Sequence, residues 1–176
     1  MEPDQANAKR EKTVVNSIVA GQGRHLLAAL VALTCLSIDS FTKAWARAYL
    51  PEGESLSFVP PLLKFTRVSN TGAAFSLGHG NGLVVAILSS LVFLGLLAWS
   101  IKRYKTREHP LLEEIGFAMV LGSAFGNLLD RYFFGRVTDF LEFQFIRFPV
   151  FNVADVLIDV GIGLILISML RNKDDR

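Results

Sequence analysis

The sequence predicts an all-α membrane protein: four transmembrane helices, a small extracytoplasmic β element and a short interfacial helix. Two observations lead to this prediction. Hydrophobic residues make up 51% of the 176 residues and charged residues only 19%, and the charges are absent from long stretches and crowded between them, as in membrane-spanning chains. A disordered chain is excluded, because that class is poor in apolar residues. The net charge of +2 does not indicate a nucleic-acid partner.

Four apolar stretches are long enough to cross a bilayer, which needs roughly 20 mostly apolar residues. They cover about residues 25–43, 83–101, 111–129 and 150–170. We therefore expect one four-helix transmembrane domain over residues 25–170, with solvated tails at 1–24 and 171–176.

Basic residues lie mainly on one side of these spans. Eleven precede the first span, separate the second from the third or follow the fourth, whereas six lie in the other two loops. The positive-inside rule then places both tails in the cytoplasm and the other two loops outside.

The first outer loop has two parts. Residues 41–50, FTKAWARAYL, mix aromatic and basic side chains as an interfacial helix does. Pro51, Gly53, Pro60 and Pro61 then interrupt helical structure, and SLSFV and LLKFTRVS are typical of short strands. The β element is expected within about residues 51–80.

Carboxylates gather at the predicted outer face. Asp39 and Asp130 are near the outer ends of spans one and three, Asp139 follows in the outer loop, and Asp155 is near the outer end of span four. An ionisable group inside a span is costly and is a functional candidate by default. Lys43 lies four residues after Asp39, which favours a structural ion pair on one helix.

Asp139 and Asp155 suggest chemistry rather than structure. A folded loop between them can bring the two carboxylates face to face, and two close carboxylates then share a proton. The charged member can take a proton from water while the neutral member polarises a carbonyl, as in an aspartic protease. Asp159, one helical turn below Asp155, would perturb that pair if it lies close.

Five motifs in order resemble those of the lipoprotein signal peptidases, the type II signal peptidases of bacteria. They are DSFTK from Asp39, NTGAAF from Asn70, GSAFGNLLDR from Gly122, VTDF from Val137 and FNVAD from Phe151. One small departure is Ser123, which stands where a second glycine is expected.

The resemblance implies a multi-pass aspartic endopeptidase of the bacterial cytoplasmic (inner) membrane, with both termini cytoplasmic and its active site toward the outer face. It implies cleavage of prolipoproteins before the diacylglyceryl-modified cysteine, contact with membrane lipids, no cofactor or metal, and a monomer. The catalytic pair maps to Asp139 and Asp155. The surrounding polar positions map to Asn70, Asn127, Asp130, Arg131, Asn152, Asp39 and Lys43.

Three other functions remain open on the residues alone. Carboxylates in spans also mark proton-coupled transporters and channels, although the inner half of this bundle is expected to be apolar. The acids could instead be structural, in an assembly factor without catalytic activity. Ser40 and Lys43 fit the S-x-x-K form of serine acylases. No H-E-x-x-H motif occurs, and the single Cys35 excludes a multi-thiolate metal site.

Overall fold

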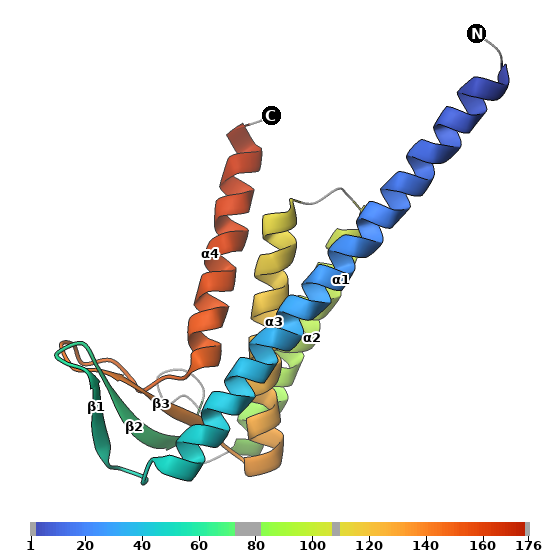
Figure 1. Cartoon of the computed structure of the whole chain (residues 1–176). Helices are drawn as coiled ribbons and strands as arrows, with labels where there is room; N and C mark the ends of the chain where they lie inside the picture. Colours follow the sequence, from blue (N-terminus) through green and yellow to red (C-terminus); the bar gives the residue numbers. More distant parts are fainter. Residues whose placement is uncertain (1–2, 73–81, 107–109, 175–176) are drawn as a thin grey trace.

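The computed structural model describes residues 3–72, 82–106 and 110–174. Its four helices are α1 (Pro3–Tyr49), α2 (Gly82–Thr106), α3 (Leu111–Phe134) and α4 (Val153–Asp174), as Figure 1 shows. Each has a segment long and apolar enough to cross a membrane: Gln22–Tyr49, Gly82–Tyr104, Leu111–Phe134 and Val153–Arg171. The four predicted spans are therefore confirmed.

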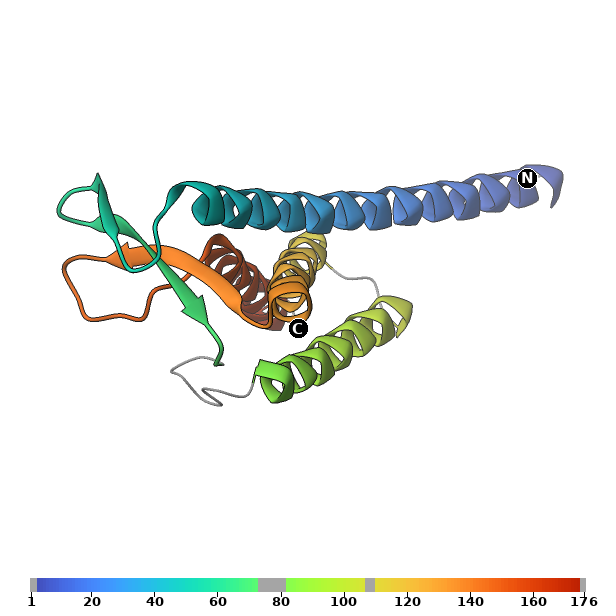
Figure 2. The same cartoon turned by 90° about the horizontal axis from the view of Figure 1, so that it is seen from below.

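Helix α3 is the central helix and packs against the other three (Figure 2). Small residues permit the closest approaches. A Cβ on Gly122 would collide with the backbone of Ala32 in α1, and one on Gly116 would lie 2.7 Å from the carbonyl oxygen of Gly161 in α4. The small residues of α3 therefore allow its backbone to approach α1 and α4 closely.

The expected interfacial helix is not a separate element. Residues 41–49 are the last turns of α1, which also extends back to Pro3 through most of the predicted tail. No proline occurs between Pro3 and Pro51, so nothing in this stretch imposes a helix break.

Three antiparallel strands lie at the end of the bundle where α4 begins. They are β1 (Ser55–Val59), β2 (Leu63–Asn70) and β3 (Val137–Phe143), in the order β1-β2-β3. The first two confirm the predicted β element, whereas β3 was expected only as a loop. Residues 73–80 of the predicted β loop lie outside the described residues.

A small aromatic core joins the sheet to α1. Trp45 of α1 meets Phe65 of β2 edge-on, with ring centroids 5.1 Å apart, and it also contacts Phe140 of β3. Gly135 ends α3 with a left-handed φ of 69°, a conformation that glycine adopts without steric cost. The chain can therefore turn within two residues from α3 into β3, which carries Asp139.

The end of the bundle farthest from the sheet was expected to be apolar, but it contains buried carboxylates. Glu113 and Glu114 near the start of α3 are 1% and 4% exposed. Glu113 forms an ion pair with Arg103 of α2. This pair joins α2 to α3 far from the sheet.

Candidate active site

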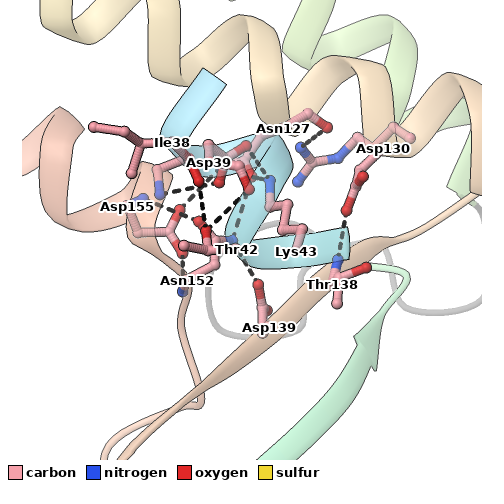
Figure 3. Close-up of polar contacts among 12 residues, drawn as sticks. Ile38, Asp39, Thr42, Lys43, Asn127, Asp130, Thr138, Asp139, Asn152 and Asp155 are labelled. Atoms are coloured by element: carbon pink, nitrogen blue, oxygen red, sulfur yellow. Dashed lines mark hydrogen bonds and ion pairs between the residues drawn. The ribbon is translucent and has the colours of Figure 1, made fainter. Parts of the chain in front are cut away.

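A buried ion pair lies on the α1 side of the site (Figure 3). Lys43, only 1% exposed, donates from Nζ to Oδ2 of Asp39 at 2.7 Å and to Oδ1 of Asn127 at 2.6 Å. The other oxygen of Asp39 accepts the backbone N–H of Ala154 at 3.2 Å. The predicted Asp39–Lys43 pair therefore also links α1 to α3 and to the start of α4.

The amide of Asn127 is oriented by these contacts. Its Oδ1 accepts from Lys43 and, at 3.3 Å, from Nδ2 of Asn152. Because both neighbours are donors, the oxygen must face them, and Nδ2 is left to donate to Oδ1 of Asp155 at 3.0 Å. Lys43 on α1 therefore determines that the Nδ2 group of Asn127, and not its oxygen, faces Asp155.

Asp155 is the third residue of α4 and belongs to a reciprocal cap. The side chain of Asn152 accepts the backbone N–H of Asp155 at 3.1 Å, while Oδ2 of Asp155 accepts the backbone N–H of Asn152 at 3.1 Å. This is the capping-box arrangement, placed where the helix dipole favours a negative group. The FNVAD segment therefore orients the carboxylate as it starts the helix.

Asp139 approaches from β3 and is 3% exposed. Its Oδ1 accepts from Nδ2 of Asn152 at 2.7 Å, and its Oδ2 accepts from Nδ2 of Asn70 at 2.9 Å. Burial raises the pKa of Asp139 to about 6; the hydrogen bonds from Asn152 and Asn70 partly oppose the rise, and the nearby charge of Asp155 adds to it. Asp139 therefore takes up a proton far more readily than an exposed aspartate.

Asn152 connects the two carboxylates. Its side chain donates to Asp139 and its backbone N–H donates to Asp155. Within the described residues the two carboxylates form no direct hydrogen bond, so they are joined through this shared donor. Asn152 is itself completely buried.

Asp130 braces the start of β3 rather than joining the pair. It accepts the backbone N–H of Thr138 at 2.9 Å and pairs with Arg47 at 3.1 Å. Arg47 also donates to the hydroxyl of Thr138 at 2.9 Å and lies over the ring of Phe134. Asp130 therefore holds the backbone of Thr138, the residue that precedes Asp139 on β3. Sequence reasoning missed Thr138, and it missed Arg47, whose partners Asp130 and Thr138 are 83 and 91 positions away in the sequence.

Arg131 lies beside the site but bonds to backbone. It donates to the carbonyl oxygens of Asn127 at 3.3 Å and of Gly72 at 3.5 Å. The nine predicted site residues are thus connected, directly or through neighbours, at one end of the spans.

Asp159 and Ser40 lie outside this network. Asp159 is exposed, and within the described residues no hydrogen bond or ion pair involves it. Ser40 is also exposed, whereas the Lys43 ammonium is enclosed by Asp39 and Asn127, an arrangement that does not suit a serine–lysine pair. No group of three potential metal ligands occurs in the described parts of the chain.

The fold and the site define a multi-pass membrane protein with a buried carboxylate centre near one membrane face. Two solved structures of bacterial membrane enzymes share this fold. One has a TM-score of 0.74 and 26% identity, covering 85% of this chain and 91% of that one. The other has a TM-score of 0.71 and 28% identity, covering 82% and 92%.

Sequence comparison identifies the family. The family model of signal peptidase (SPase) II matches residues 31–171. The lipoprotein signal peptidase of Gloeobacter violaceus is 42% identical, covering 82% of each chain, and that of Microcystis aeruginosa is 41% identical, covering 82% of this chain and 92% of its own. The chain belongs to the signal peptidase II family and is a membrane-spanning protease.

Proposed function

We propose that this protease removes signal peptides from prolipoproteins, cleaving before the diacylglyceryl-modified cysteine, with Asp139 and Asp155 as its catalytic pair. One observation supports this most: two carboxylates from different elements meet on the single buried donor Asn152. A substrate that carries lipid must be met at the bilayer, and the pair lies where α4 begins its span.

The two carboxylates take different roles. Asp155 lies at a helix N-terminus, which favours negative charge, and acts as the base. Asp139, whose pKa is raised to about 6 by burial, acts as the protonated acid. Water gives its proton to Asp155 and attacks the scissile carbonyl carbon, while Asp139 gives its proton to the carbonyl oxygen.

Collapse of the resulting tetrahedral diol completes the reaction. The proton taken by Asp155 passes to the amide nitrogen, and the C–N bond breaks. Asp139 recovers a proton from one hydroxyl as the new carboxylic acid forms. The pair returns to its starting state, with one water consumed. The three amides Asn70, Asn127 and Asn152 hold the carboxylates in place throughout.

The charge asymmetry supports an orientation in the bacterial inner membrane. Eleven basic residues flank the end of the spans opposite the site, so both tails, 1–24 and 171–176, are cytoplasmic under the positive-inside rule. The transmembrane domain, about residues 25–170, then presents its site and its β-rich loop at the outer face, as a monomer without a cofactor.

Isosteric substitutions test the pair. Asp139→Asn and Asp155→Asn are each expected to fold and to lose cleavage of a diacylglyceryl-modified substrate by roughly 10³-fold or more, because general acid–base groups contribute 10²–10⁴-fold. Asp159→Asn is the matched control: the same change one turn along α4 should leave cleavage unchanged. Retained cleavage in either of the first two variants would remove that residue from the catalytic role.

The same variants test the transporter alternative. If the carboxylates conduct protons, vesicles containing the purified protein will show a proton flux that Asp139→Asn abolishes. We expect no such flux. The buried Glu113 and Glu114 at the opposite end make this measurement necessary, because polar groups are present at both ends of the bundle.

A further inference from the structure

The free end of the sheet exposes apolar side chains that the site does not use. Phe58 and Leu62 flank the turn between β1 and β2, and Phe145, Ile146 and Phe148 lie in the loop after β3. Each is between 47% and 59% exposed. We call these five residues the sheet tip. Clustered exposed apolar groups of this kind mark a contact surface.

The position of the tip relative to the bilayer follows from α4. Its membrane segment, Val153–Arg171, has 19 residues and is about 28 Å long at 1.5 Å per residue. The hydrocarbon core is about 30 Å thick, so Val153 must lie at its border. The strands project sideways beyond α4, as both views show, and Figure 1 shows the turn between β1 and β2 level with the end where α4 begins (Figures 1 and 2). The tip therefore lies at the same border.

The two faces of the sheet differ in polarity. Ser57, Lys64 and Glu142 are cross-strand neighbours on one face, where Lys64 pairs with Glu142 at 3.0 Å. Phe58, in contrast, stacks on Phe65 at 4.4 Å, and Phe65 contacts Trp45 of α1. The apolar face is therefore the one turned toward the helices, and the loop 145–148 lines a hollow together with the three polar side chains of the other face.

A basic residue accompanies the apolar group. Arg147 lies between Ile146 and Phe148, is exposed, and forms no ion pair within the described residues. A guanidinium binds phosphate oxygens in a bidentate manner. An arginine among aromatic and aliphatic side chains suits the headgroup region of a bilayer.

We propose that the sheet tip inserts into the membrane leaflet at the site end of the bundle, with Arg147 on a phospholipid phosphate. The apolar surface of the spans is thus continuous with a second, lateral membrane contact. Because β3 leads from the tip to Asp139, this contact holds one catalytic carboxylate at a fixed depth. The inference does not depend on the proposed substrate.

Fluorescence quenching tests this insertion directly. The sequence has one cysteine, Cys35, so Cys35→Ala provides a background for Phe148→Cys and for Glu54→Cys, an exposed position just before β1 at the other end of that strand from the tip. Each full-length variant is labelled with an environment-sensitive fluorophore and placed in phosphatidylcholine–phosphatidylglycerol vesicles. We expect doxyl-labelled lipids to quench the probe at 148 several-fold more than the probe at 54, and aqueous iodide to do the reverse. Equal quenching by iodide at both positions would overturn the proposal.

Two further measurements test whether the tip binds a second copy of the chain and whether Arg147 contacts a phosphate. If the tip instead binds a second copy of the chain, the emission at 148 will change with the protein-to-lipid ratio, which would also overturn the proposal; we expect no change. Arg147→Gln is expected to reduce lipid quenching at 148, and unaltered quenching would contradict the phosphate contact. These readouts do not require cleavage, so their failure is distinct from failure of the proposed function.

Discussion

The hydrogen bond from Asn70 to Asp139 gives a quantitative prediction for Asn70→Ala. The bond is 2.9 Å long and acts on a carboxylate that is 3% exposed. Hydrogen bonds to charged groups contribute about 1.5–3 kcal/mol, and the lower end applies because Asn70 is half-buried. Since about 1.4 kcal/mol corresponds to one pKa unit, loss of the bond is expected to raise the pKa of Asp139 by about one unit.

The sign of the effect on activity follows from the role as acid that we propose for Asp139. Asn70 stabilises the ionised carboxylate, so its removal favours the protonated acid. The alkaline limb of the pH profile of kcat/KM, where the pair loses its last proton, should therefore move upward by about one pH unit. The assay is cleavage of a fluorogenic diacylglyceryl peptide in mixed micelles over the pH range from 4 to 10.

A neighbouring substitution controls for damage to the strand. Ser69 precedes Asn70 on β2, but its hydroxyl donates to Glu52 at 2.5 Å and not to the site. Ser69→Ala should leave the limb in place. An unmoved limb in Asn70→Ala, or an equal shift in Ser69→Ala, would refute the assignment of Asp139 as the acid.

Three further predictions concern stability. Lys43→Met leaves the buried carboxylate of Asp39 unpaired, so we expect the free energy of unfolding, followed by thermal melts, to fall by about 3–5 kcal/mol. Adding Asp39→Asn should recover much of this stability, and no recovery would contradict the pairing. Gly126→Ala places a methyl group against the Asp39 carboxylate and should lower both melting temperature and cleavage, whereas Gly163→Ala, with open space around it, should change neither. Glu113→Gln should destabilise by about 1–3 kcal/mol without altering the pH profile of cleavage, and a shifted profile would contradict its remoteness from the site.

The spans could be predicted because they depend on local properties. Length and hydropathy alone indicate a helix that crosses a bilayer, and the prolines after α1 predict where the strands begin. Strand β3 was missed because VTDFLEF is short and contains Asp139 and Glu142, residues depleted in strands. Its conformation comes from pairing with β2, which lies far away in the sequence.

The site was predictable in composition but not in geometry. The topology places the aspartates at one depth, and the motifs indicate Asn127 and Asn152. The orientation of the Asn127 amide requires knowing that Lys43 approaches its oxygen, across 84 positions of sequence. Arg47 was missed for the same reason, since its partner Asp130 is 83 positions away.

The choice of amides around the proposed catalytic pair has an electrostatic consequence. Lys43 and Arg47 each have a carboxylate partner, Asp39 and Asp130 respectively, and within the described residues neither cation donates a hydrogen bond to Asp139 or Asp155. The groups that donate to Asp139 are the neutral amides of Asn70 and Asn152. Neutral donors satisfy the lone pairs of a buried carboxylate without cancelling its charge.

Two carboxylates enclosed in this way still repel each other, and the repulsion is relieved when the pair holds one proton. Had arginine or lysine replaced the amides, direct ion pairs would stabilise both ionised carboxylates and remove the acid. The raised pKa of Asp139, caused first by burial, is the measurable sign of this arrangement. The amides therefore do more than hold the carboxylates in position: they favour the singly protonated state that the proposed mechanism requires.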